Sequence, residues 1–191
     1  MIHETTHYFE TAGREHTEET LKLAVTTARA LGIKNIVLAT TEGGTAKMMA
    51  DSIDHEGITV TVVTHAFGQA TPNTNPMSAE LRRYLIEKGF QICTAAHALS
   101  GAERCLSKTF TGVYPVEIIA HTLRMFGQGT KVCVECAIMA MDADELVFAA
   151  PVVALGGTGG GLDTAMVITP SYSSSILDTK IHEILCKPSL K

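Results

Sequence analysis

The segment 35–46, which reads NIVLATTEGGTA, constrains the fold of this chain more than any other stretch. Its residues 36–39 form a short continuous apolar run, which is typical of a strand buried on both faces of a parallel sheet. Polar residues and glycines end the run, and a helix is predicted to begin at Gly44 or Thr45. The segment therefore predicts a strand, a loop and a helix in direct succession.

The loop between this strand and this helix is a candidate anion site. The first turn of a helix has backbone N–H groups without intrahelical partners, and the helix dipole favours a negative charge there. The small residues of the loop would let a ligand approach the backbone closely. An ordinary strand-to-helix turn with hydroxyl caps is the alternative. The candidate residues are Thr40, Thr41, Glu42, Gly43, Gly44 and Thr45.

A second loop, GGTGGGLDT, follows a predicted strand at 151–155. It lacks the Lys of a P-loop, and it leads into another predicted strand at 165–169, whereas a dinucleotide-binding loop leads into a helix. A flexible turn is one interpretation of the glycines. Two glycine loops after strands of one sheet instead suggest the two walls of one crevice. The candidate residues here are Gly156, Gly157, Thr158, Gly159, Gly160, Gly161, Asp163 and Thr164.

The segment 65–76 has neither a helical nor a strand period. Long loops at the carboxyl end of a strand often bind ligands, and a surface excursion without function is the alternative. His65 and Phe67 are able to stack on a ligand or to hydrogen-bond to it. With the adjacent Gly68, they are the candidates in this loop.

The segment 97–105, which reads HALSGAERC, is dense in polar residues. Ser100 and Gly101 are candidates for a helix N-terminus that faces the same ligand, and an interhelical turn is the alternative. We interpret Glu103 and Arg104 as a surface ion pair, because exposed pairs are common and contribute little to stability.

The segment 131–141 is apolar nearly all round and predicts a buried helix. Glu135 is the anomaly in it, because a buried carboxylate needs a hydrogen-bonding partner or a ligand, and it is therefore a candidate site residue. Cys133 and Cys136 form a C-x-x-C pattern, but no second pair at zinc spacing accompanies them. We interpret them as two buried small residues on one helix face, in preference to a dithiol or a metal site.

Hydrophobic spacing and capping residues predict the remaining elements. Residues 1–13 are expected either to pair as an edge strand or to lie over the site. Helices are expected at 17–31, at 45–55 before a stop at Gly57, at 78–89 and at 115–125, and strands at 58–64, 90–94 and 180–186, the last with a terminal helix as the alternative.

Length and composition limit the class of protein. A chain of 191 residues predicts one domain, 1–191. A net charge of -5 without clustered Lys or Arg excludes a nucleic-acid partner. No apolar run reaches the ~18 residues of a membrane helix, so the 46% hydrophobic share predicts a homo-oligomer. The N-terminus, with His3, Glu4 and His7, lacks the features of a signal peptide, and the five irregularly spaced cysteines agree with the cytoplasm.

Together these segments resemble the C-terminal domain of pyruvate kinase, and more closely the free-standing archaeal and bacterial proteins that are similar to that domain. In pyruvate kinases two loops hold the phosphates of an effector sugar, and the segments 41–46 (TEGGTA) and 159–166 (GGGLDTAM) resemble them. The segments 13–21, 96–104 and 131–135 are similar to motifs of the free-standing proteins. The resemblance covers most of the chain.

The resemblance implies an α/β fold, namely a three-layer α/β/α sandwich with a mostly parallel, mixed sheet of five to six strands. It also implies a pocket for a phosphorylated small molecule, with flavin mononucleotide (FMN) as a candidate occupant and cofactor. The catalytic barrel of pyruvate kinase is absent, so we expect no pyruvate kinase activity. The Trp and Arg that grip the sugar phosphate are absent too, since the chain has no Trp and residues 156–161 contain no Arg, which argues against a sugar bisphosphate.

Two classes of function stay open. The first is a binding or regulatory module, with its pocket at the carboxyl ends of the strands 36–39 and 151–155. The second is an enzyme that uses the same pocket, with or without a flavin, in which His65, His97 or Glu135 transfers protons. No nucleophile beside a base is evident in the sequence, so the binding module is favoured.

Overall fold

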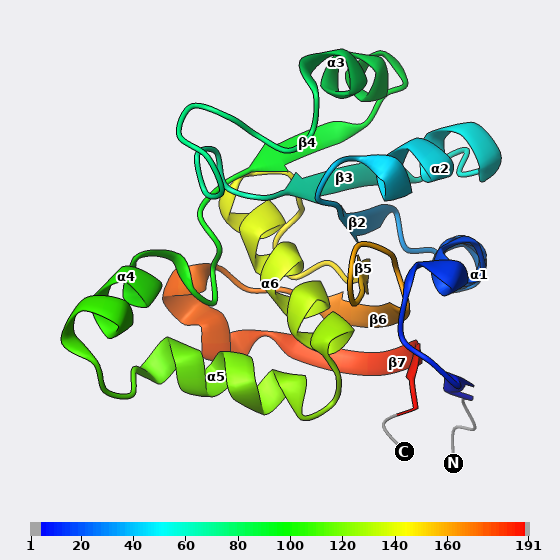
Figure 1. Ribbon diagram of the computed structural model, residues 1–191. Helices are drawn as coiled ribbons and strands as arrows, with labels where there is room; N and C mark the ends of the chain where they lie inside the picture. The colour runs from blue at the N-terminus through cyan, green and yellow to red at the C-terminus, as the bar shows by residue number, and fades with distance from the viewer. Residues whose placement is uncertain (1–4, 190–191) are drawn as a thin grey trace.

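The computed structural model describes residues 5–189, which fold around one seven-stranded sheet of order β1-β7-β6-β5-β2-β3-β4 (Figure 1). Its strands are β1 (His7–Phe9), β2 (Asn35–Ala39), β3 (Thr59–Thr64), β4 (Gln91–Thr94), β5 (Val152–Gly156), β6 (Thr164–Thr169) and β7 (Lys180–Pro188). Among these strands β6 alone runs against its neighbours. The predicted mostly parallel, mixed sheet is confirmed, but seven strands exceed the expected five to six, because β1 adds an edge strand on β7.

The helices cover both faces of this sheet. They are α1 (Thr17–Leu31), α2 (Gly44–Ser52), α3 (Ala79–Glu87), α4 (Gly101–Phe110), α5 (Pro115–Arg124) and α6 (Gln128–Asp142), with the short 3₁₀ helices η1 (Arg14–His16) and η2 (Ser173–Asp178). Figure 1 shows α6 lying across one face of the sheet, with α4 and α5 farther out on that side. No described helix is both long enough and apolar enough to cross a membrane. His3 and Glu4 lie outside the described residues.

Alternate residues of the central strand face two separate cores. Ile36 and Leu38 of β2 pack in the core formed with α1, α2 and α3, whereas Val37 packs in the core formed with α6. All three side chains are fully buried. The apolar run of 36–39 thus lies in a sheet covered on both faces, and the predicted three-layer α/β/α architecture is confirmed.

The helix predicted at 45–55 ends earlier than expected. It is α2, which ends at Ser52 because Ile53 takes extended angles (φ −117°, ψ 120°) and buries its side chain in the core. Asp54 then accepts a hydrogen bond of 3.1 Å from the backbone N–H two residues later, a local bond that competes with helix formation. Gly57, predicted as the helix stop, instead has a φ of +78° in the turn before β3.

Two glycines let α6 lie unusually close to the sheet. A Cβ atom on Gly129 would lie 2.0 Å from Oγ1 of Thr164 and 2.9 Å from Oδ1 of Asp163. A Cβ atom on Gly156 would lie 2.5 Å from the carbonyl oxygen of Gly129. The N-terminal turn of α6 therefore rests directly on the loop between β5 and β6, and most residues of α6 are buried within the chain.

We expect Gly129→Ala to lower the free energy of unfolding by about 1–3 kcal/mol, because the added methyl group overpacks a contact with the side chains of Thr164 and Asp163. Gly44→Ala is the matched control, since a Cβ at that helical position meets nothing within 4 Å. Urea unfolding monitored by circular dichroism measures both variants. Equal stabilities of the two variants would show that α6 does not need this close approach.

Candidate functional site

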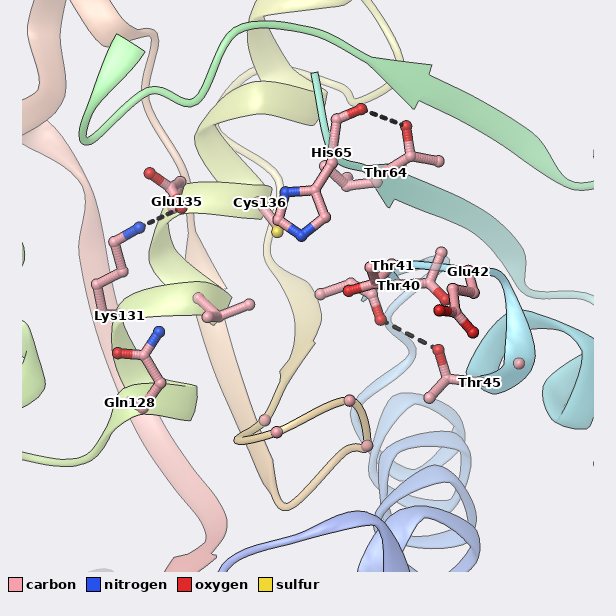
Figure 2. A pocket seen from close by; sticks show the side chains of 18 of the residues that line it. Thr40, Thr41, Glu42, Thr45, Thr64, His65, Gln128, Lys131, Glu135 and Cys136 are labelled. Carbon is pink, nitrogen blue, oxygen red and sulfur yellow. Dashed lines mark hydrogen bonds and ion pairs between the residues drawn. The ribbon is translucent and has the colours of Figure 1, made fainter. Parts of the chain in front are cut away.

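A cavity of about 880 Å³ opens where the parallel strands β2 and β3 end, and we call it the central pocket. Figure 2 shows three of its sides, namely the loop after β2, the glycine loop after β5, and α6. It is lined by these candidates from the sequence: Thr40, Thr41, Glu42, Gly44, Thr45, His65, Glu135, Gly157, Gly159, Gly160 and Gly161. The other candidates do not line it: Gly43, Phe67, Gly68, Ser100, Gly101, Gly156, Thr158, Asp163 and Thr164.

The loop between β2 and α2 leaves backbone donors free at the start of α2. Gly43 is the N-cap residue with a φ of +96°, and a Cβ atom there would lie 2.3 Å from the side chain of Leu81. Its own N–H donates to Oγ1 of Thr40 (3.1 Å), and the Thr45 hydroxyl donates to the carbonyl of Ala39 (3.2 Å). No side chain caps α2, so the N–H groups of its first turn, which begins at Gly44, remain as donors for an anion.

The glycine loop is shaped by a buried carboxylate. Asp163 is fully buried and accepts hydrogen bonds from the N–H groups of Gly13 (3.2 Å) and Thr158 (3.1 Å) and from the hydroxyl of Thr164 (2.8 Å). Asp163 therefore joins the N-terminal segment to both ends of the glycine loop. Its oxygens face the protein, and the loop presents its glycine backbone to the pocket.

Arg14 is brought to the pocket by the same loop. A Cβ atom on Gly161 would lie 2.2 Å from Cα of Arg14, so only glycine allows the two backbones to approach this closely. The tip residues Gly159 and Gly160 have φ of +68° and +96°, which favour glycine. Of the two expectations for residues 1–13, the edge strand is confirmed by residues 7–9, whereas none of residues 5–13 lines the pocket. The next residue, Arg14, is the one that enters the pocket wall.

The sequence interpretation missed the basic residues of the pocket. They come from four different elements and are Arg14, Arg104, Arg124 and Lys131. Lys131 and Glu135 are four residues apart on α6, and Arg124 ends the preceding helix, so their spacing carried a usable signal. Arg14 and Arg104 instead reach the pocket only through tertiary packing. The interpretation of Glu103 as the partner of Arg104 was wrong, because Glu103 accepts hydrogen bonds from two N–H groups at the start of α5 (3.2 and 3.0 Å).

Glu135 has the partners that its burial requires. It accepts a hydrogen bond from the N–H of Leu99 (3.0 Å) and forms an ion pair with Lys131 (Figure 2). The side chains of Lys131 and Glu135 are each only 5% exposed. Nδ1 of His97 lies 3.7 Å from the same carboxylate. Nε2 of His97 in turn lies 3.2 Å from Nδ1 of His65, whose ring projects into the pocket. A continuous series of titratable groups therefore runs along one wall.

Cys133 and Cys136 are both buried, as the sequence predicted, and neither is in a disulfide. Cys133 donates a hydrogen bond of 3.3 Å to the carbonyl of Ala154. Burial raises the pKa of both thiols above the ordinary range, which disfavours the thiolates. Cys136 lines the pocket, where a neutral thiol provides a weakly polar surface.

We expect Asp163→Ala to lower the free energy of unfolding by about 1–3 kcal/mol for each donor that stays buried without an acceptor. The glycine loop should also become mobile, because Thr158 and Gly13 lose their common partner. Asp178→Ala is the control, since Asp178 is exposed in η2. Urea unfolding and amide hydrogen exchange measure the two effects. Unchanged exchange in the glycine loop of Asp163→Ala would contradict this role.

Stability should depend on pH through His97. Burial lowers the pKa of His97 below its ordinary 6.5, against the opposing effect of Glu135, and His65, Lys131 and Arg104 lower it further. The unfolded chain then binds this proton more readily, so the contribution of His97 is fully present above pH 6.5 and is lost as the pH falls toward the lowered folded pKa.

Chemical denaturation above and below pH 6.5 measures this dependence. We expect His97→Asn to show a weaker loss of stability on acidification than the unchanged protein, because the group that titrates is gone. His121→Asn, which removes an exposed histidine of α5, should retain the full pH dependence. A parallel pH dependence in all three proteins would exclude His97 as its source.

Comparison with protein families gives one match. The family model described as the pyruvate kinase alpha/beta domain matches residues 18–168 of the 191 residues. The matched part contains the loop after β2, the whole glycine loop and α6, and it ends in β6. The chain therefore belongs to the pyruvate kinase alpha/beta domain family.

Proposed function

We propose that the central pocket binds a phosphorylated small molecule, and that the chain acts as a binding or regulatory domain without pyruvate kinase activity. One observation carries this proposal. In a chain of net charge -5, four basic side chains and the uncapped start of α2 converge on a single cavity. Basic side chains and helix N-terminal N–H groups are the groups that hold phosphate in proteins.

In this proposal each of the two glycine-containing loops places different groups around the phosphate. The first turn of α2 donates backbone N–H groups to the phosphate, and Arg14 contributes the positive charge from the opposite side, next to Gly160 and Gly161. Positive φ at Gly160 exposes its peptide groups to the ligand. A cavity of about 880 Å³ lies within the usual range of pockets for drug-sized ligands, which supports a ligand larger than inorganic phosphate.

FMN is the candidate ligand and cofactor that we propose to test first. Its phosphate would occupy the site between α2 and Arg14, and its ring system would extend along α6. A freshly purified protein that retains FMN absorbs in two bands between the near ultraviolet and the blue, so its spectrum gives a first answer.

The alternative is an enzyme that uses the same pocket, and the series of titratable groups from Glu135 through His97 to His65 favours it. A homo-oligomer and a cytoplasmic location stay predictions. The apolar helix α6 is buried within the chain and is not free to form an oligomer interface. Helices α4 and α5 and the residue after α5 expose apolar side chains that a second copy would cover, namely Leu106, Phe110, Ile118 and Met125. Light scattering with size exclusion tests that prediction, and a monomer would contradict it.

We expect Arg14→Gln to weaken the binding of FMN and of inorganic phosphate about ten- to a hundredfold, because a hydrogen bond to a charged group contributes about 1.5–3 kcal/mol. Riboflavin, which lacks the phosphate, should bind both proteins equally and more weakly than FMN. Isothermal titration calorimetry measures all three ligands. Arg83→Gln is the matched control, since Arg83 is exposed on α3 and does not line the pocket.

Equal affinities for riboflavin and FMN would reject the phosphate site. An unchanged affinity of Arg14→Gln for phosphate, with its melting temperature preserved, would reject the part assigned to Arg14.

A further inference from the structure

Two stacked histidines lie at the end of the pocket wall formed by Glu135. The rings of His65 and His97 are nearly parallel, with centroids 5.1 Å apart and an angle of 19° between them. His65 Nδ1 lies 3.2 Å from His97 Nε2, and His97 Nδ1 lies 3.7 Å from Glu135. Polar atoms of His97 thus connect a buried carboxylate to His65. The ring of His65 projects into the cavity (Figure 2).

The neighbours of these rings determine where their protons lie. Nδ1 of His97 lies 3.7 Å from the Glu135 carboxylate, and a hydrogen on this nitrogen faces the carboxylate oxygen. Nε2 of a neutral His97 then has no hydrogen and accepts from Nδ1–H of His65, at 3.2 Å. The side-chain amide of Gln69 also lies 3.1 Å from Nδ1 of His65. This arrangement leaves Nε2 of His65 with a free lone pair.

We infer that His65 is the general base of an acid–base reaction on the bound ligand, and that His97 and Glu135 are positioning residues that hold its ring and tautomer. The inference rests on the phosphate site of the proposed function and extends the enzyme alternative, since the ligand must be held by its phosphate in the same pocket. A base aligned by a hydrogen-bonded second group, itself aligned by a carboxylate, is an arrangement typical of catalytic sites.

The pocket brings the base and the phosphate site together. His65 follows β3, which pairs in parallel with β2, and the loop after β2 leads into α2. Both His65 and the first residues of α2 line the central pocket. The substrate class is therefore a phosphorylated molecule that carries an acidic C–H, N–H or O–H group.

The proton balance of the step needs no further reactant. Nε2 of His65 takes the proton of the substrate X–H bond, and the electron pair of that bond stays on X. The resulting imidazolium keeps its Nδ1–H donated to His97, whose own Nδ1–H faces the negative charge of Glu135. Lys131 and Arg124 in the same wall favour the negative charge on X, and His65 returns the proton to the product.

The tautomers provide a test that needs no ligand. Multiple-bond ¹H–¹⁵N correlation spectra of the full chain, labelled with ¹⁵N-histidine, distinguish protonated from unprotonated ring nitrogens. We expect His65 and His97 both to carry hydrogen on Nδ1 when neutral, with exposed His121 as the internal reference. A hydrogen on Nε2 of His65 would overturn the inference, because the lone pair would then point away from the ligand.

Reactivity tests the role of the positioning residues. Diethyl pyrocarbonate acylates unprotonated imidazole nitrogens, and peptide mapping resolves each histidine. We expect His65 to react faster than His121, and we expect His97→Asn to remove this advantage. The double variant Lys131→Met with Glu135→Gln removes the ion pair without leaving a buried charge, and it should also slow the acylation of His65, because the carboxylate that orients His97 is gone. A rate of His65 acylation that does not change in either variant would reject the positioning role of His97 and Glu135.

Titration of inorganic phosphate separates this inference from the proposed function. If the unchanged protein binds phosphate but His65 carries its hydrogen on Nε2, the role of His65 as a base is rejected and the phosphate site stands. The expected tautomer without phosphate binding in the unchanged protein rejects the binding site and removes the substrate class proposed for the base.

Discussion

The buried carboxylate of Asp163 is the group on which the geometry of the pocket depends. One side chain accepts hydrogen bonds from Gly13 before η1, from Thr158 inside the glycine loop and from Thr164 at the start of β6. A charged group removed from water is costly unless it is hydrogen-bonded, and these three donors supply the partners that the carboxylate needs. The glycine loop, the N-terminal segment and the sheet are therefore held in one arrangement, and Arg14 faces the pocket as a result.

The second constraint is the close approach of α6 to the sheet. Gly129 and Gly156 bring backbone against backbone, so the helix has little freedom to rotate about its axis. With that rotation fixed, the side chains at 128, 131, 132, 135, 136 and 139 face the cavity as one helix face. Gly156, a candidate ligand contact in the sequence, thus serves the packing of α6, and the site follows from this packing.

The sequence predicted the fold well because local patterns carried it. The continuous run of 36–39 identified a strand covered on both faces, and the all-apolar segment 131–141 identified a buried helix. The edge strand β1 was left open, because three residues provide too short a pattern and its pairing with β7 joins the two ends of the sequence. The end of α2 was predicted too late, because the burial of Ile53 is a tertiary effect.

The pocket was predictable where its residues follow strands directly, and at Glu135, which stood out as a carboxylate in an apolar helix. Thr40 to Gly44 and the glycines after β5 stand at such positions, and so does His65 after β3. Arg14 and Arg104 have no local signal, since the first reaches the pocket through its contact with Gly161 and the second through the placement of α4. The contacts of His97 had no local pattern in the sequence either, because 32 residues separate His65 from His97 and Glu135 lies farther along the chain.

Stability does not account for the ion pair of Lys131 and Glu135. Both side chains are 5% exposed, and the cost of removing two charges from water often exceeds their attraction. Replacing such a pair by apolar residues of similar volume is often neutral or stabilises by about 1–4 kcal/mol. A chain that needed only a stable helix here would gain from Leu or Met at these positions. The pair instead places the Glu135 carboxylate beside His97 and the Lys131 amino group in the pocket wall, which ties its presence to the pocket and not to the core.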